Sequence, residues 1–140
     1  DMTRTFLKGK APKKIKKAFD AVKDAHEAAK RMIRAGVPAA SVHHAALDTL
    51  TAAGFPTGKK NDGTPFGFIH GLGHGLGLEI HEQPRVSPLN PQPLAAGNVI
   101  TVEPGLYDPA WGGIRLEDVV MVTSKSYTCF NKMDMSLEIP

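Results

Sequence analysis

The sequence lacks the features that mark several classes of protein. It has one cysteine, Cys129, which excludes an internal disulfide and with it a secreted, disulfide-stapled scaffold. A lone thiol favours a reducing, cytoplasmic location. No apolar run approaches the roughly 18 residues that a membrane-spanning helix needs, so a membrane span is also excluded.

Aromatic residues are scarce, at 6% of the chain, although the net charge is +3 and the sequence pI is about 9.1. Six lysines cluster between Lys8 and Lys17. Proteins that bind single-stranded nucleic acid usually set aromatic side chains among their cationic ones, and none lies within this cluster. We therefore interpret the lysines as a solvated loop and helix start, which disfavours a nucleic-acid partner.

The remaining composition is that of a globular protein. The 140 residues are 41% hydrophobic and 22% charged, which is typical of one folded domain spanning residues 1–140. A chain of this length can bury a core without a disulfide or a structural metal.

Hydrophobic periodicity predicts helices first and strands afterwards. Residues 2–6 alternate as in a short strand, and apolar residues recur every three or four positions over 12–34 and 39–53, as in amphipathic helices. After the turn-rich segment 56–67, strand-like runs occupy 68–72, 76–81, 98–103, 114–122 and 127–130, and 83–97 is a proline-rich link. This order predicts an α+β fold, with two main helices on one face of an antiparallel sheet.

Three histidines lie on the predicted helices: His26, His43 and His44. Each belongs to an ordinary amphipathic pattern. We expect them to be surface or partly packed residues without a functional role.

A run of histidines and glycines stands out between His70 and Gln83, where three histidines and four glycines occupy fourteen residues. Glycine weakens a strand and commonly marks a bulge or a place where a ligand approaches the backbone. On a regular strand His70 and His74 face the same side. His81, seven residues beyond His74, needs a bend to join them, and the glycines can supply it.

Two glutamates, Glu103 and Glu117, lie in or at the end of apolar strands. Buried carboxylates are costly unless they are paired or bound to a metal. Arg115 shares a strand face with Glu117, so these two residues, taken alone, could be a structural ion pair. When the histidine run is considered as well, a metal site of carboxylates and imidazoles explains these residues better. Such a site suits Mn, Fe, Co or Zn. Helical His-Glu-x-x-His, paired-cysteine, serine-elbow and phosphate-loop motifs are absent.

Four motifs in one order make the sequence resemble the pita-bread metallopeptidases, and within them the Xaa-Pro aminopeptidase and prolidase branch. They are Asp1 to Phe6, His70 to Glu82, Val102 to Gly105, and Arg115 to Asp118. The resemblance implies the C-terminal, larger part of a pita-bread fold with a curved antiparallel sheet. It also implies that residues 1–140 are one partial catalytic domain that lacks its N-terminal portion.

The resemblance implies the metal ligands residue by residue. Asp1 and Glu117 correspond to the family's two bridging carboxylates, and His74 and Glu103 to the remaining ligands of the first ion. A further aspartate is expected eleven residues before Asp1, outside this sequence. The intact enzyme would hold two ions, whereas this chain is expected to hold at most one well and to be impaired in activity.

The resemblance also implies the catalytic roles. Glu103 would accept a proton from the attacking water, while His70 and His81 would steady the intermediate and Arg115 would orient ligands. The substrate would be a peptide with proline in the second position, cleaved by an aminopeptidase or a dipeptidase. We also expect a homo-oligomer, because a half-sheet leaves an edge unpaired.

Two other functions share this fold. A creatinase-like hydrolase works without metal, and a non-catalytic module of the histone-chaperone kind binds a peptide or histone-like partner. Retention of all four ligands disfavours both, and only the lysine cluster favours the second.

Overall fold

The computed structural model describes all residues, 1–140. It contains two helices, α1 (Lys13–Met32) and α2 (Ala39–Ala52). The strands are β1 (Leu7–Lys8), β2 (Gly58–Lys59), β3 (Pro65–Phe66), β4 (Gly73–Gly75), β5 (Glu82–Val86), β6 (Val99–Val102), β7 (Gly105–Asp108), β8 (Gly112–Arg115), β9 (Asp118–Val122), β10 (Tyr127–Cys129) and β11 (Glu138–Ile139).

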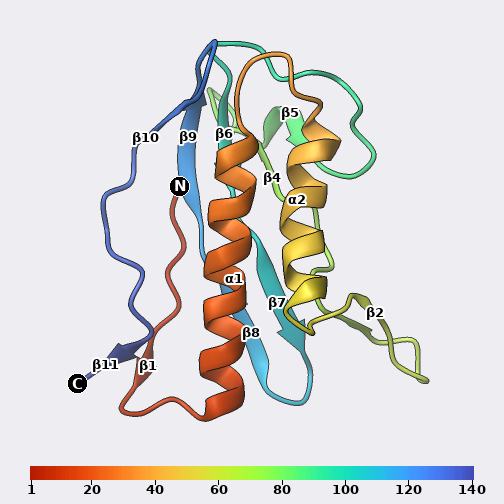
Figure 1. Cartoon of the computed structure of the whole chain (residues 1–140), viewed down its shortest axis with the longest axis vertical. Helices are drawn as coiled ribbons and strands as arrows, with labels where there is room; N and C mark the ends of the chain where they lie inside the picture. The colour runs from red at the N-terminus through yellow and green to blue at the C-terminus, as the bar shows by residue number, and fades with distance from the viewer.

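The main sheet is antiparallel, with its strands in the order β10-β9-β6-β4-β5. The hairpin of β7 and β8 lies near its end, and both helices lie side by side across one face (Figure 1). The predicted α+β fold with two helices on one face of an antiparallel sheet is therefore confirmed. Strand β1 pairs with β11 in parallel. Neither helix has the length and apolar character that a membrane span requires.

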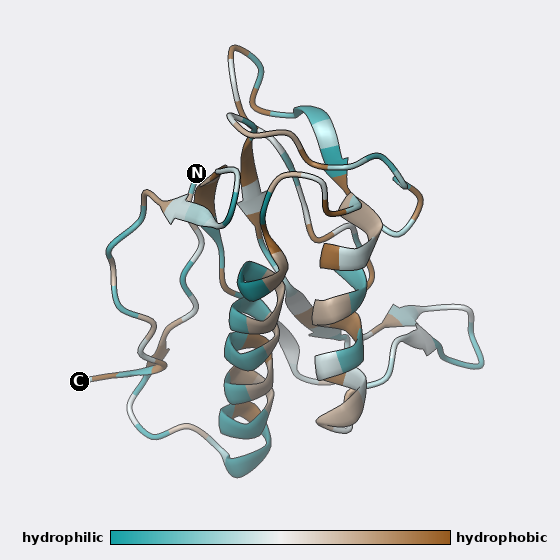
Figure 2. Cartoon of the chain, turned by 45° about the horizontal axis from the view of Figure 1, so that its top comes forward, coloured by the Kyte–Doolittle hydropathy of each residue, from teal (hydrophilic) through white to brown (hydrophobic).

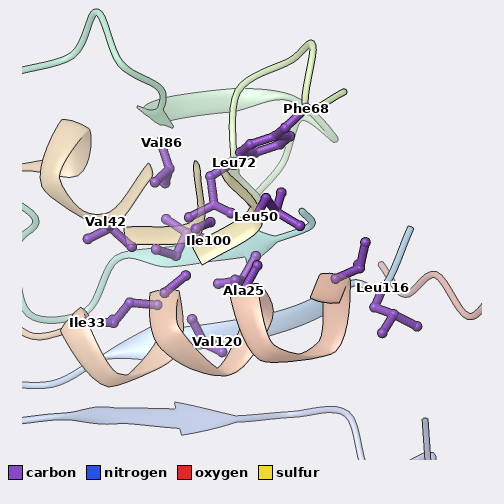
Figure 3. Packing of buried hydrophobic residues seen from close by; sticks show 14 of the residues in the cluster. Ala25, Ile33, Val42, Leu50, Phe68, Leu72, Val86, Ile100, Leu116 and Val120 are labelled. Carbon is purple, nitrogen blue, oxygen red and sulfur yellow. The ribbon is translucent and has the colours of Figure 1, made fainter. Parts of the chain in front are cut away.

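The core fills the space between the helices and the sheet. Helix α1 turns a hydrophilic face outward and an apolar stripe inward (Figure 2). Four lysines of the cluster, Lys13, Lys14, Lys16 and Lys17, lie in this helix and are exposed. Ala25 of α1, Ile33 directly after its end, and Val42 and Leu50 of α2 pack toward strand residues such as Ile100 (Figure 3). Burial of this apolar surface supplies the main favourable term in folding.

Three of the predicted strands are absent, and a fourth, 114–122, is divided between β8 and β9, which belong to different sheets. Residues 2–6 form a single bridge, Thr3 with Glu117, and the strand begins only at Leu7. Segments 68–72 and 76–81 are not strands, and the strand between them is β4. Strand β5 begins at Glu82 and occupies the start of the predicted link 83–97. Glycine explains the displacement, because Gly73 and Gly75 have no side chain and let the β4 backbone come close to Thr101 and Gln83.

The expectation that His26 and His43 are surface or partly packed is also wrong. Their exposed fractions are 0% and 3%, because each follows a buried position of its helix by four residues and shares that face. Burial, and then the charge of Lys30, lowers the pKa of His26 to about 4 although Asp118 and Glu27 oppose the shift. His44 is exposed, as expected.

The buried His43 predicts that stability depends on pH. Burial lowers its pKa from 6.5 to about 4, with His44 and His70 adding to the shift. In the unfolded chain the imidazole gains a proton below about pH 6.5, whereas in the folded chain it stays neutral down to about pH 4. The unfolded state thus binds more protons in this window. The free energy of unfolding should fall by up to about 3 kcal/mol as the pH drops through it.

Urea unfolding at pH 7 and pH 4.5 tests this expectation. His43→Phe keeps an aromatic ring on Phe68 and should make the pH dependence shallower, leaving the contribution of His26. His44→Phe, on the exposed neighbour, is the matched control. An unchanged pH dependence in His43→Phe would show that His43 does not carry the effect.

Candidate active site

Three of the expected side chains, those of Asp1, Glu103 and Glu117, converge on a fourth, His74. The donor atoms of Asp1, His74 and Glu117 lie within 4.8 Å of one another. The Nε2 atom of His74 is 3.3 Å from Oε1 of Glu103 and 3.9 Å from Oδ2 of Asp1. Asp1 lies in the N-terminal segment, His74 in β4, Glu103 directly after β6 and Glu117 directly before β9. These positions are far apart in sequence, so the fold brings them together.

The donor set fits a divalent cation. His74 is buried, and its Nδ1–H donates to the carbonyl of Gly75 at 3.1 Å, which leaves the Nε2 lone pair facing the carboxylates. Three carboxylates and one imidazole provide the oxygen and nitrogen donors that Mn, Fe, Co and Zn accept. Glu117 is only 2% exposed, and a cation would offset the cost of burying its charge.

Thr101 links two of these residues, which the sequence reasoning missed. Its fully buried hydroxyl accepts from the backbone N–H of His74 at 3.0 Å and donates to Oε1 of Glu103 at 3.1 Å. The signal was present in the alternation of β6, because Thr101 and Glu103 are two residues apart and share a face.

Arg115 and Glu117 form no direct ion pair, which was the alternative to a metal site for these two residues. Thr3 lies between them instead: its hydroxyl donates to the carboxylate of Glu117 and accepts from Nε of Arg115 at 3.1 Å. Arg115 therefore orients Glu117 through Thr3. Thr3 lies in the first of the four motifs, but no role was predicted for it.

Arg4 holds the backbone around Glu117 in place. Its guanidinium donates to the carbonyl of Glu117 at 2.6 Å and to Oδ1 of Asp118 at 2.7 Å. Both side chains are 4% exposed, and charge-assisted hydrogen bonds of this kind are strong when buried. The backbone that carries Glu117 is thus fixed, and no sequence pattern indicated this contact.

His70 is held by two partners. Its Nδ1–H donates to the carbonyl of Gly71 at 2.7 Å, and Nε2 accepts from the hydroxyl of Tyr107 at 3.1 Å. Burial lowers the pKa of His70 and raises that of Tyr107, so both are neutral at pH 7. Tyr107 is a further residue that the sequence reasoning missed.

His81 joins the cluster through the bend that the glycines allow. Its ring lies 4.3 Å from that of His74, centroid to centroid, at an angle of 72°. A cleft of about 540 Å³ opens over the cluster and is lined by His70, His74, His81, Glu103, Arg115 and four other residues. All seven expected site residues therefore lie in this cleft or within the cluster beside it.

Comparison with known proteins places the chain in a family. The sequence profile of metallopeptidase family M24 matches residues 1–124. The chain is 35% identical over 137 residues to the Xaa-Pro dipeptidase of Pyrococcus furiosus, covering 98% of this chain and 37% of that protein. It is 39% identical over 127 residues to an uncharacterized peptidase of Staphylococcus aureus strain MW2, covering 91% and 34%.

A solved structure agrees with the sequence relatives. The X-Pro aminopeptidase of Thermotoga maritima superposes with a TM-score of 0.86 at 30% identity, covering 99% of this chain and 37% of that one. The chain thus spans about a third of the length of the relatives it matches, with their pita-bread architecture. The cleft, the converging donors and these relatives lead to one conclusion: the chain belongs to metallopeptidase family M24.

Proposed function

We propose that the protein hydrolyses the peptide bond before proline in a metal-dependent reaction, as an Xaa-Pro aminopeptidase or dipeptidase. The observation that carries the proposal is the convergence of Asp1, His74, Glu103 and Glu117 beside a cleft. The similarity of this chain to an Xaa-Pro dipeptidase supports the choice of substrate class.

In this proposal the four converging residues hold a divalent ion, one of Mn, Co, Fe or Zn. When bound, such an ion lowers the pKa of a water and polarises the scissile carbonyl. The chain's own residues fix the geometry: Thr101 orients Glu103, Thr3 orients Glu117, and Gly75 sets the tautomer of His74.

Glu103 is the group that accepts the proton of the attacking water and passes it toward the leaving prolyl nitrogen. Its carboxylate faces the cleft and is held by the Thr101 hydroxyl. His70, fixed by Gly71 and Tyr107, and His81, against His74, lie on the walls where the tetrahedral intermediate would form. An N–H donor at that position stabilises developing negative charge. His81 can supply one directly, whereas Nε2 of His70 accepts from Tyr107 and would act as a donor only when it carries a proton.

Two ions are proposed for the intact enzyme. Residues 1–140 supply four ligands, and three of these surround His74, so we expect at most one ion to be held well by this chain. We also propose that the enzyme is a cytoplasmic homo-oligomer, from its single cysteine and its unpaired sheet edges β5 and β10.

Dipeptide specificity tests the proposal. The full-length protein that carries this chain, loaded with Mn²⁺, should release free alanine from Ala-Pro and leave Ala-Ala intact, since it would act before proline. Equal turnover of both dipeptides would contradict the proline specificity. If alanine is still released from Ala-Pro after complete removal of metal, the reaction does not depend on metal and the proposal is contradicted.

A further inference from the structure

A second hollow, of about 480 Å³, borders the cleft. Its walls include Leu47 of α2, Phe68 and the segment around Leu89. It shares three residues with the cleft: His70, Gly71 and Ser87. The two hollows therefore meet at His70, and a molecule that fills the cleft can extend into the second one.

The second hollow is apolar. Leu89 is 90% exposed and Ile69 is 44% exposed, although both are large hydrophobic residues. One side is an aromatic stack: the ring of His43 lies 4.9 Å from that of Phe68 at 22°, and Phe68 meets His70 edge-on at 5.1 Å. An apolar side chain would gain free energy by covering these surfaces.

No charged side chain lines this hollow. Of its two histidines, His70 is shared with the cleft. The other, His43, is 3% exposed, and its Nδ1 atom has no hydrogen-bond partner. Burial lowers the pKa of His43 to about 4, so the ring is neutral at pH 7. The hollow therefore suits an uncharged, hydrophobic group, in contrast to the polar cleft beside it.

We propose that this hollow is a subsite for an apolar side chain of the residue that follows proline in the substrate. The inference rests on the proposed function. Hydrolysis before a proline in second position leaves one residue on the N-terminal side of the scissile bond, so any longer extension of the substrate lies on the C-terminal side. The cleft accommodates the first residue and the proline, and the hollow beyond His70 takes the third. Tripeptides and longer peptides with an apolar third residue are then the preferred substrates.

Tripeptide turnover by the Mn²⁺-loaded full-length protein tests this proposal. We expect kcat/KM to be about tenfold higher for Ala-Pro-Leu than for Ala-Pro-Gly, the scale of a hydrophobic pocket's discrimination. Leu89→Ser should bring this ratio close to one and leave turnover of Ala-Pro unchanged. Because Leu89 is exposed, its replacement should not disturb folding. Ile139→Ser, at an exposed residue of β11, is the matched control and should keep the wild-type ratio.

Other results of these assays would contradict either the subsite or the proposed function. Equal turnover of the two tripeptides, a ratio that survives Leu89→Ser, or cleavage of Ala-Pro without cleavage of either tripeptide would overturn the subsite. The same holds if Leu89→Ser changes instead the preference between Leu-Pro and Gly-Pro, because the hollow would then take the first residue. Absence of turnover with every proline peptide would contradict the proposed function itself.

Discussion

Replacing Glu103 by glutamine should reduce Xaa-Pro hydrolysis by the full-length protein about a hundredfold to ten-thousandfold, the range of general acid–base catalysis. Glutamine has nearly the same shape and can still accept the hydrogen bond that Thr101 donates. It cannot take up the proton of the attacking water. The effect should appear in kcat, because a proton transfer in the transition state is lost.

Loss of metal would also lower activity, since Glu103 lies 3.3 Å from Nε2 of His74. Metal content of the purified variant separates the two causes: activity lost with metal retained identifies the proton acceptor. Glu79→Gln, at an exposed carboxylate of the same region, is the matched control and should keep wild-type turnover. Undiminished turnover in Glu103→Gln would remove Glu103 from the mechanism.

Gly73→Ala should have the largest effect on stability. A Cβ atom at this position would lie 2.0 Å from the carbonyl oxygen of Thr101, which is backbone of the paired strand region and cannot rotate away. Strand β4 would have to move away from β6, and overpacking of this kind costs about 1–3 kcal/mol or more. The movement would also break the bond from the His74 N–H to Thr101, so metal affinity should fall together with stability.

Gly71→Ala is the matched comparison, two residues away in the same run. Its added Cβ would meet Ser87 and Val86 at 3.3 Å, which a small shift relieves. Urea unfolding should therefore show a much smaller loss for Gly71→Ala than for Gly73→Ala. Equal losses would mean that close approach at Gly73 is not what fixes β4.

The sequence predicted the helices well because their signal is local. The apolar stripe of α1 repeats every three or four residues from Ile15 to Ile33, and only a helix places those residues on one face. The histidine and glycine run was harder to assign. Its strand is determined by the contact of Gly73 with Thr101, and that contact joins segments that are remote in sequence.

The same distinction between local signals and remote contacts applies to the candidate site. The four proposed ligands were identified from motifs, and the structure brings them together as the resemblance implied. The residues that hold them were not identified. Thr3 and Arg4 act across more than 110 positions, on Glu117 and Asp118. Tyr107, in the hairpin of β7 and β8, contacts His70, which is 37 residues away in sequence. Such contacts follow from tertiary packing, which leaves no periodic signal in the sequence.

The central claim is that Asp1, His74, Glu103 and Glu117 form one metal-binding set. Isothermal titration of Mn²⁺ into the chain of residues 1–140 tests it most directly, with Glu117→Gln and the exposed control Glu79→Gln titrated in parallel. The account predicts one tight equivalent in the parent chain and in Glu79→Gln, and a strongly weakened one in Glu117→Gln. Two tight equivalents, or one that persists undiminished in Glu117→Gln, would contradict it.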